Sequence, residues 1–273
     1  LVPLWREHQV IARMLAHNLA SIRYPDFHFF VGAYPNDPET QSAIQSVASR
    51  FPNVHLAVCP HDGPTSKADC LNWIYQHIGL YEERTGERFE ILVTHDAEDL
   101  IHPDELSCIN DYASRYDFIQ IPVLALQTPL RAITHGVYCD EFAENHTRDM
   151  IVRSRLGCFV PGAGVGTGYR RVALEKLAAS AENRIFEPAA LTEDYENGLR
   201  LHRLGCSQMF VPILRASGES SDFLVTREFF PQSWTTALKQ RTRWVMGICL
   251  QGWERLGWQG SIGDIYWFWR DRK

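Results

Sequence analysis

The stretch ILVTHDAEDLIHP, residues 91–103, joins a strand pattern to an acidic turn. Its first four residues, from Ile91 to Thr94, suit a buried strand. Three acids follow within four positions: Asp96, Glu98 and Asp99. Carboxylates this close repel one another and are rarely buried without a partner. The turn is therefore either a solvated loop or a place where a cation belongs.

Strand and helix patterns alternate on both sides of this stretch. Strand patterns cover residues 27–34, 54–59, 89–94 and 117–127, and helical patterns cover 8–22, 36–51, 66–86 and 103–115. This alternation predicts an α/β fold, in which a mostly parallel central sheet is flanked by helices on both faces. Ligands of such sheets bind outside the carboxyl ends of the strands. The turns that carry Asp37 and Asp96 both follow strand patterns, so they fall at such ends.

The second half of the chain is less regular. Its patterns predict a long helix over 131–155, a glycine-rich stretch over 157–171, a helix over 192–205, a strand over 206–214 and a long helix over 231–256. No repeat or clear linker separates these elements. We therefore expect one catalytic domain over residues 1–230, with residues 231–273 as a helical C-terminal segment of the same domain.

The composition narrows the class of protein. Hydrophobic residues make up 45% of the 273 residues and charged residues 22%, which is typical of a globular domain. A net charge of −6 argues against a nucleic-acid-binding protein. The seven cysteines are scattered without a CxxC motif, as in a reduced, cytosolic protein. The chain opens without Met, as expected of a piece of a longer protein, and it ends in the aromatic and basic GDIYWFWRDRK. Such an end suits amphipathic, interfacial helices beside a membrane segment, and it also suits an ordinary amphipathic end.

Two features near the acidic turn suit a diphosphate. Asp96 and Glu98, separated by one residue, can hold Mg²⁺ or Mn²⁺, which prefer oxygen ligands. Lys67 stands in the first turn of a predicted helix, where backbone N–H groups already favour anions. Each feature also has a structural explanation, as a solvated loop and a solvated lysine. Asp37 likewise suits the N-cap of the helix that follows it.

Two later motifs suit sugar chemistry. Glu193 and Asp194 open a predicted helix; they complement its dipole, and Asp194 could also act as a general base. Gln240, Arg243 and Trp244 share one helix face, a combination that suits phosphate and the apolar face of a sugar ring. The alternative for Trp244 is a core position. The alternating glycines at 162, 164, 166 and 168 do not match a dinucleotide motif, and form either a strand-edge loop or a loop that admits substrate.

In their order along the chain, these motifs resemble the processive family-two glycosyltransferases of the cellulose-synthase-like branch. The resemblance rests on VPLWRE at 2–7, YPND, KADCLN, HDAED, TED and the QxxRW pattern, and it extends from residue 2 to residue 244. It implies a GT-A (Rossmann-like) fold, a UDP-sugar donor, an Mg²⁺ or Mn²⁺ ion and inversion at the anomeric carbon.

The resemblance also implies a role for each site residue. Trp5, Glu7 and Asp37 would line the uridine pocket, with Lys67 and Asp96 beside the donor. Asp96 and Glu98 would hold the metal, and Asp194 would be the general base. The acceptor and diphosphate side would consist of Glu193, Gln240, Arg243 and Trp244. Two departures weaken this mapping: Glu98 replaces the usual second Asp, and Trp5 and Arg6 stand where the family often has Tyr and Asn.

The resemblance implies partners beyond this chain. The sugar, expected to be an N-acetylhexosamine, would pass to a growing glycan acceptor in exopolysaccharide synthesis. The protein would lie on the cytoplasmic face of the bacterial inner membrane, anchored by segments outside this chain. An outer-membrane partner protein and cyclic-di-GMP regulation are expected outside it as well.

Two other functions fit parts of the sequence. A metal-dependent phosphohydrolase could use His61, Asp62, His95, Asp96 and His102, but it leaves TED and QxxRW unexplained. A catalytically degenerate module that binds a nucleotide sugar and serves as a scaffold is the second alternative.

Overall fold

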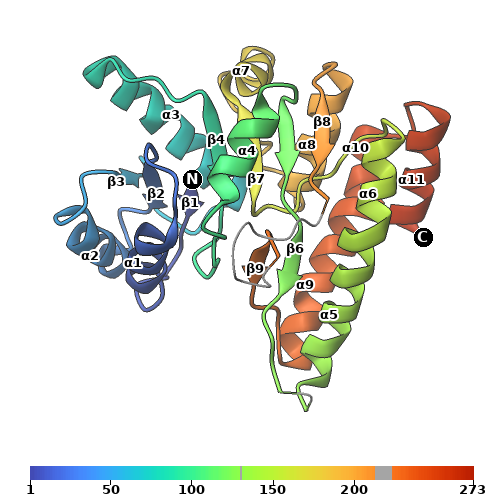
Figure 1. Ribbon diagram of the computed structural model, residues 1–273, viewed down its shortest axis with the longest axis horizontal. Coiled ribbons are helices and arrows are strands. Elements are labelled where there is room, and N and C mark those ends of the chain that lie inside the picture. The colour runs from blue at the N-terminus through green and yellow to red at the C-terminus, as the bar shows by residue number, and fades with distance from the viewer. Residues whose placement is uncertain (130, 213–222) are drawn as a thin grey trace.

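The structure, a computed structural model, describes residues 1–129, 131–212 and 223–273. Its N-terminal part is built on a parallel sheet of β1 (Val2–Pro3), β2 (Phe29–Ala33) and β3 (Val54–Val58), which lie side by side in that order. Val31 at the centre of β2 is paired with Val2 on one side and with Leu56 on the other. The parallel order follows from the helices that connect the strands (Figure 1).

A second sheet has the order β4–β7–β5–β8. Its strands are β4 (Ile91–Thr94), β7 (Thr167–Arg170), β5 (Phe118–Gln120) and β8 (Gln208–Phe210). β7 is antiparallel to β4 and β5, whereas β5 and β8 are parallel. The two sheets are linked at Leu1, whose amino group donates to Val93 O at 2.6 Å and whose carbonyl accepts from His95 N at 3.0 Å. The predicted α/β class is confirmed, with β7 as an antiparallel strand that the alternation did not indicate.

Helices cover both faces of the first sheet. Helices α1 (Ile11–Ser21) and α2 (Pro38–Ala48) share one apolar cluster with Val31, whereas α3 (Lys67–Thr85) shares another with Phe30. Successive side chains of a strand point to opposite faces, so neighbouring residues of β2 serve different helices. Gly32 lets α3 approach closely, because a Cβ there would lie 2.6 Å from Cys70 Sγ.

The helix ends follow the local sequence signals. The side chain of Asp37 accepts from Thr40 N at the start of α2, and that of Ser66 accepts from Asp69 N at the start of α3. Helix α3 ends at Gly86, whose φ of +78° favours glycine. The N-cap predicted for Asp37 is confirmed. The remaining helices of this part are α4 (Glu105–Ala113), α7 (Arg171–Ala179) and α8 (Glu193–Arg203).

One predicted strand is wrong. The pattern over 117–127 suggested a single strand, but the structure has β5 and then β6 (Val123–Ala125), with Pro122 between them. Proline has no N–H to continue the ladder. β6 instead pairs in parallel with β9 (Thr226–Glu228), a strand that the sequence patterns did not indicate. The predicted strand at 206–214 is shortened to β8, and its last two residues lie outside the described residues.

The two long predicted helices are continuous helical segments with a π turn inside each. The first consists of α5 (Ile133–Glu144), the π turn Asn145–Asp149 and α6 (Met150–Arg155); the second consists of α9 (Trp234–Trp244), the π turn Val245–Gln251 and α10 (Gly252–Leu256). They run side by side, followed by α11 (Ile262–Arg272) (Figure 1). Tyr138 of α5 donates to Ala237 O of α9 at 3.3 Å. No helix in residues 1–129, 131–212 and 223–273 is long and apolar enough to span a membrane.

Candidate functional site

Lys67 is the centre of a charged cluster at the carboxyl ends of the strands. Its Nζ lies 2.5 Å from Asp96 Oδ1 and 3.5 Å from Gly164 O. The start of α3, the end of β4 and the glycine-rich stretch therefore meet at one point. The Lys67 and Asp96 side chains are 24% and 30% exposed, so the pair remains accessible from solvent.

Lys67 is held in its charged form. Burial alone would lower the pKa of the ammonium group, but Asp96, Glu193 and Asp194 raise the pKa above its usual value. The two acids of the TED motif thus act on Lys67 from α8, across the site from the acidic turn. An ammonium group in this position can bind the phosphate oxygens of a ligand.

The glycine-rich stretch packs directly against Asp194. Gly164 has a φ of +81°, and a Cβ at this position would lie 2.9 Å from Asp194 Oδ2 and 3.3 Å from Lys67 Nζ. A Cβ at Gly162 would lie 2.9 Å from Asp194 O. The stretch therefore forms a wall of the charged cluster before it continues into β7. Burial raises the pKa of the Asp194 carboxyl group, whereas Lys67 lowers it.

The α9 helix reaches the same cluster through a close contact. A Cβ at Gly247, in the π turn after α9, would lie 2.6 Å from Thr192 Oγ1, so this turn packs tightly on the start of α8. Arg243 lies one helical turn earlier and lowers the pKa of both Glu193 and Asp194. Arg243 and the TED acids are thus placed together, as the sequence suggested.

The other two residues of the QxxRW pattern are placed differently. Gln240 Oε1 is buried and has no hydrogen-bond partner in the described part of the chain. Trp244 packs on Tyr138 and Phe142, with ring centroids 5.9 and 6.1 Å away. The structure thus places Trp244 in the apolar α5–α9 cluster, which was the structural alternative for this residue. A role in acceptor binding remains a prediction.

Glu193 gives this site a testable pH dependence. The residue is 7% exposed, and burial together with Asp194 raises its pKa from 4.5 to about 7. The pKa of this carboxyl group is higher in the folded chain than in the unfolded chain. The free energy of unfolding therefore falls as pH rises from the unfolded pKa to the folded pKa.

Glu193→Gln removes this titration. We expect the variant to gain stability relative to the wild type by about 1–3 kcal/mol between pH 5 and pH 8. Thermal unfolding at both pH values measures the difference. A stability difference that is the same at pH 5 and pH 8 would contradict the assignment.

The predicted uridine residues form a second group beside the cluster. Asp37 Oδ2 accepts from Arg6 N at 2.6 Å, and Glu7 N donates to Thr40 Oγ1 at 3.1 Å, so the opening segment is tied to the start of α2. The Trp5 ring meets Tyr34 edge to face at 5.5 Å. Burial, then Asp96 and Asp37, raises the pKa of Glu7. Asp37 therefore acts both as an N-cap and as an anchor for the opening segment.

The acidic turn has the donor chemistry for a divalent cation. Burial together with Asp96, Asp99 and Glu7 raises the pKa of the Glu98 carboxyl group to about 7. Lys67 offsets this like charge only in part, and a bound cation would relieve the rest. Asp99, in contrast, is fully buried, and its Oδ2 accepts from Asp96 N and lies 2.9 Å from His95 Nδ1. Asp96 and Glu98 therefore fit a metal ion better than Asp99 does.

The histidines proposed for a phosphohydrolase do not converge on Asp96. His95 lies between Asp99 and Glu105, His102 Nδ1 accepts from Asp104 N, and His61 lies beside Asp69. Within the described residues, no group of three or more His, Cys, Asp or Glu side chains is arranged to hold a metal ion. The structure thus gives these histidines other partners.

One acidic residue at the site was missed in the sequence. Burial raises the pKa of Glu228 in β9 well above its usual value, and Asp99, Asp96 and Glu98 contribute to the shift. Its strand is bridged to the acidic turn by hydrogen bonds between Leu100 and Arg227. No local signal marks Glu228, because its position depends on pairing between segments that are distant in sequence.

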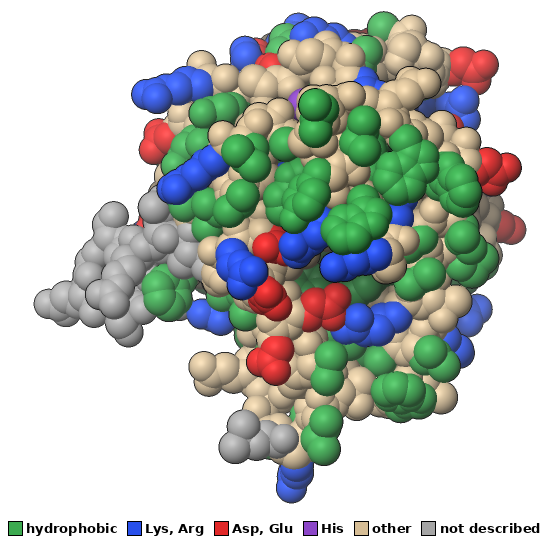
Figure 2. All heavy atoms as spheres, turned by 90° about the vertical axis from the view of Figure 1, so that its right-hand side faces the viewer, with side chains coloured by type: hydrophobic (Ala, Val, Ile, Leu, Met, Phe, Trp, Pro, Cys, Tyr) green, Lys and Arg blue, Asp and Glu red, His purple; other side chains and the backbone are tan. Residues whose placement is uncertain are grey.

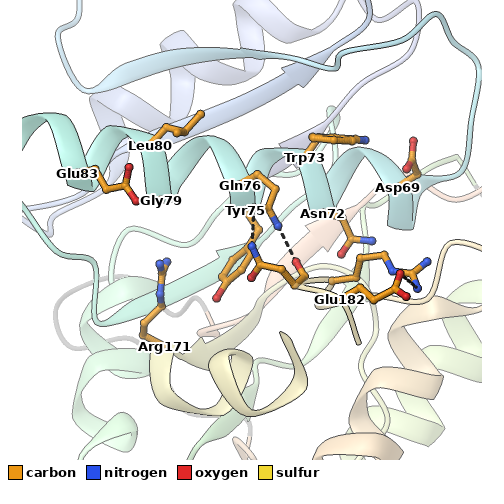
Figure 3. Close-up of a pocket in the computed structure, with 12 residues that line it drawn as sticks. Asp69, Asn72, Trp73, Tyr75, Gln76, Gly79, Leu80, Glu83, Arg171 and Glu182 are labelled. Carbon is orange, nitrogen blue, oxygen red and sulfur yellow. Dashed lines mark hydrogen bonds and ion pairs between the residues drawn. The ribbon is translucent and has the colours of Figure 1, made fainter. Parts of the chain in front are cut away.

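A separate cavity of about 720 Å³ lies along α3. Its walls include Trp73, Gln76, Arg171 and Asn183, and Figure 3 shows Gln76 linked to the loop after α7. Two amide hydrogen bonds, of 2.6 and 2.7 Å, join Gln76 and Asn183. None of the predicted site residues lines this cavity.

Comparison with known proteins gives a family match over most of the chain. The sequence profile of the family described as "Glycosyltransferase like family 2" matches residues 1–247. Bacteriophage adsorption protein B of Escherichia coli K12 is 41% identical over 286 aligned residues, which cover the whole of this chain and 38% of that protein. Bacteriophage N4 adsorption protein B of Escherichia coli O157:H7 gives the same values. The chain thus spans about two-fifths of the length of these relatives.

Solved structures share the fold. The mannosyltransferase PcManGT from Pyrobaculum calidifontis, in complex with GDP-Man and Mn²⁺, has a TM-score of 0.67 at 17% identity, with coverage of 99% of this chain and 71% of that one. S. aureus TarS 1–349, in complex with UDP-GlcNAc, has a TM-score of 0.57 at 12% identity, with coverage of 90% and 64%. The GT-A fold expected from the sequence is confirmed.

Proposed function

The chain belongs to glycosyltransferase-like family 2, and from this we propose that it transfers a sugar from a UDP-sugar to a growing glycan with inversion at the anomeric carbon. The observation that carries the proposal is the cluster around Lys67: its Nζ contacts Asp96 Oδ1 and Gly164 O, and the Asp194 carboxylate packs against Gly164. A cation for phosphate, a carboxylate pair for a metal and a candidate base are thus next to one another.

The mechanism follows from these positions. Lys67 binds the diphosphate oxygens, and Arg243 adds positive charge from the acceptor side. Asp194 takes the proton from the acceptor hydroxyl while the hydroxyl oxygen attacks the anomeric carbon. The bond between that carbon and the diphosphate oxygen breaks, and UDP leaves with the electron pair. Attack from the face opposite UDP inverts the configuration.

Mg²⁺ or Mn²⁺ would be held by Asp96 and Glu98. When bound, the ion neutralises charge on the diphosphate and so improves it as a leaving group. We assign Glu98 rather than Asp99, because Asp99 is fully buried and already engaged by His95 and Asp96 N. The Mn²⁺ in the PcManGT complex supports a divalent ion in this fold.

The choice of donor rests on the ligands of the structural neighbours. The UDP-GlcNAc bound to TarS favours UDP and an N-acetylhexosamine, whereas PcManGT binds GDP-Man. Trp5, Glu7 and Asp37 would line the uridine pocket, since they form one connected group beside Asp96.

A panel of UDP-sugars and GDP-mannose tests the proposal. We expect Mn²⁺-dependent release of UDP from one UDP-sugar, in membranes that carry the full-length protein. Release of phosphate from simple phosphoesters without any acceptor would instead favour a phosphohydrolase. Binding of UDP with metal, but no turnover of any donor, would favour a scaffold module.

We also propose that the C-terminal segment rests on the cytoplasmic face of the bacterial inner membrane. Figure 2 shows large apolar side chains interspersed with Lys and Arg on the face over α10 and α11. Ile262, Trp253 and Trp269 are 89%, 58% and 54% exposed there. Aromatic and basic side chains together favour a membrane interface.

Replacing Trp253 and Trp269 by Ala should release the chain from anionic phospholipid vesicles. We expect at least about a tenfold loss of vesicle binding, since each indole buries a large apolar area at the interface. Cosedimentation measures it. Leu80→Ala on α3, also exposed at 63%, is the control and should bind like the wild type. Equal binding of all three chains would rule out this surface.

The names of the two relatives, both phage adsorption proteins, support a location in the bacterial envelope for the full-length protein. We propose that the polymer made here, together with an outer-membrane partner and cyclic-di-GMP control outside this chain, serves phage adsorption. Loss of adsorption in cells that carry an Asp194→Asn protein would support this link, and unchanged adsorption would argue that only the protein itself is needed.

A further inference from the structure

His95 lies between two buried carboxylates. Its Nδ1 is 2.9 Å from Asp99 Oδ2 and its Nε2 is 2.9 Å from Glu105 Oε1. The His95 side chain is 4% exposed and both acids are fully buried. Charged groups are rarely buried this deeply unless they are paired.

The first carboxylate fixes the acidic turn. Asp99 Oδ2 also accepts from Asp96 N at 2.9 Å. Asn18 holds the backbone that follows: its Nδ2 donates to Asp99 O and its Oδ1 accepts from Ile101 N, both at 3.1 Å. The backbone that presents Asp96 and Glu98 is thus closed by Asp99, whose orientation depends on His95.

The second carboxylate leads to β9. Glu105 Oε2 accepts from Thr226 Oγ1 at 2.9 Å, and Thr226 is fully buried. Leu100 and Arg227 exchange backbone hydrogen bonds of 3.1 and 3.2 Å beside this contact. The contacts therefore run without a gap from Asp96, through Asp99, His95 and Glu105, to the strand that carries Glu228 and precedes α9.

We propose that His95 is a positioning residue that fixes the Asp96–Glu98 turn against β9. The residues proposed for the metal and the diphosphate thereby keep a constant position relative to the α9 side of the site. This inference rests on the proposed function. Imidazole presents two nitrogens in opposite directions, as two facing carboxylates require. A glutamine amide would donate to one carboxylate and turn its oxygen toward the other, which would leave a buried acid unpaired.

Calorimetry of UDP binding to the purified full-length protein, with and without Mn²⁺, tests the proposal. In His95→Gln we expect the Mn²⁺-dependent part of UDP binding to weaken by about 10–100-fold, the effect typical of residues that orient metal ligands. Metal-free UDP binding should change little, because the uridine side is held by other contacts. The Mn²⁺ concentration for half-maximal transfer should rise in parallel.

His135→Gln is the matched control. His135 is also fully buried between two acceptors, with Nδ1 3.0 Å from Phe230 O and Nε2 2.8 Å from Leu126 O, but both are backbone carbonyls. The His135→Gln variant should be less stable than the wild type, but the Mn²⁺ dependence of its UDP binding should be unchanged. Thr226→Val keeps His95 and removes only the link to Glu105, and it should shift the Mn²⁺ dependence in the same direction as His95→Gln.

The outcomes are distinct. Wild-type Mn²⁺-dependent UDP affinity in a folded His95→Gln protein would overturn the inference. If that variant does not fold, Thr226→Val decides, and an unchanged Mn²⁺ dependence there overturns it. A wild-type protein that binds no UDP with Mn²⁺ would overturn the proposed function, and the inference with it.

Discussion

Asp194→Asn should reduce sugar transfer by about 10²–10⁴-fold, while UDP binding persists. Asparagine has nearly the shape of aspartate but cannot take the proton of the acceptor hydroxyl. Asp194 raises the pKa of Lys67 and packs closely against Gly162 and Gly164, and an amide of almost the same size can occupy its space. UDP release with saturating donor measures transfer, and calorimetry measures UDP affinity.

Asp117→Asn serves as the control for Asp194→Asn. Asp117 binds Ser207 through two hydrogen bonds, of 2.9 and 3.0 Å, at the start of β5, so its loss should affect stability but leave transfer close to the wild-type rate. If Asp194→Asn lost UDP affinity and kept transfer, Asp194 would belong to the donor site and another residue would be the base.

Gly164→Ala should lower transfer by about 10²-fold. Its Cβ would lie 2.9 Å from Asp194 Oδ2 and 3.3 Å from Lys67 Nζ, so one or both groups must move. Displacements of about 1 Å in reacting groups can cost about this factor. The measurement is kcat for UDP release at saturating donor, together with the melting temperature.

Gly86→Ala separates the steric effect from backbone strain. Gly86 has nearly the same φ, +78° against +81° for Gly164, but a Cβ there would meet nothing within 4 Å. Both variants should lose stability, since alanine is strained at positive φ. Only Gly164→Ala should lose transfer. Equal transfer in the two variants would mean that the glycine contact with Asp194 does not matter for the reaction.

The sequence predicted well whatever depends on near neighbours. The N-cap of α2 at Asp37 and the helical range predicted for α3 depend on residues within a few positions of each other, so the local signals were sufficient. The motif order also predicted the residues that meet around Lys67. The strand over 117–127 was wrong because Pro122 sends its two halves to different sheets, and the partner β9 is more than a hundred residues away.

The tertiary structure decided which of the possible roles each residue has. Lys67 and Gly164 are 97 residues apart, and only the packing of α3, β4 and β7 shows that Lys67 binds Asp96 and approaches Asp194. It likewise buried Asp99 beside His95, packed Trp244 against the α5–α9 cluster and brought Glu228 to the acidic turn. The sequence alone determined most of the helices, the strands β2, β3 and β4 and the inventory of chemical groups, because these depend on local hydrogen bonds and periodicity. Charge pairing and burial depend on contacts between distant segments, so they were decided only by the folded chain.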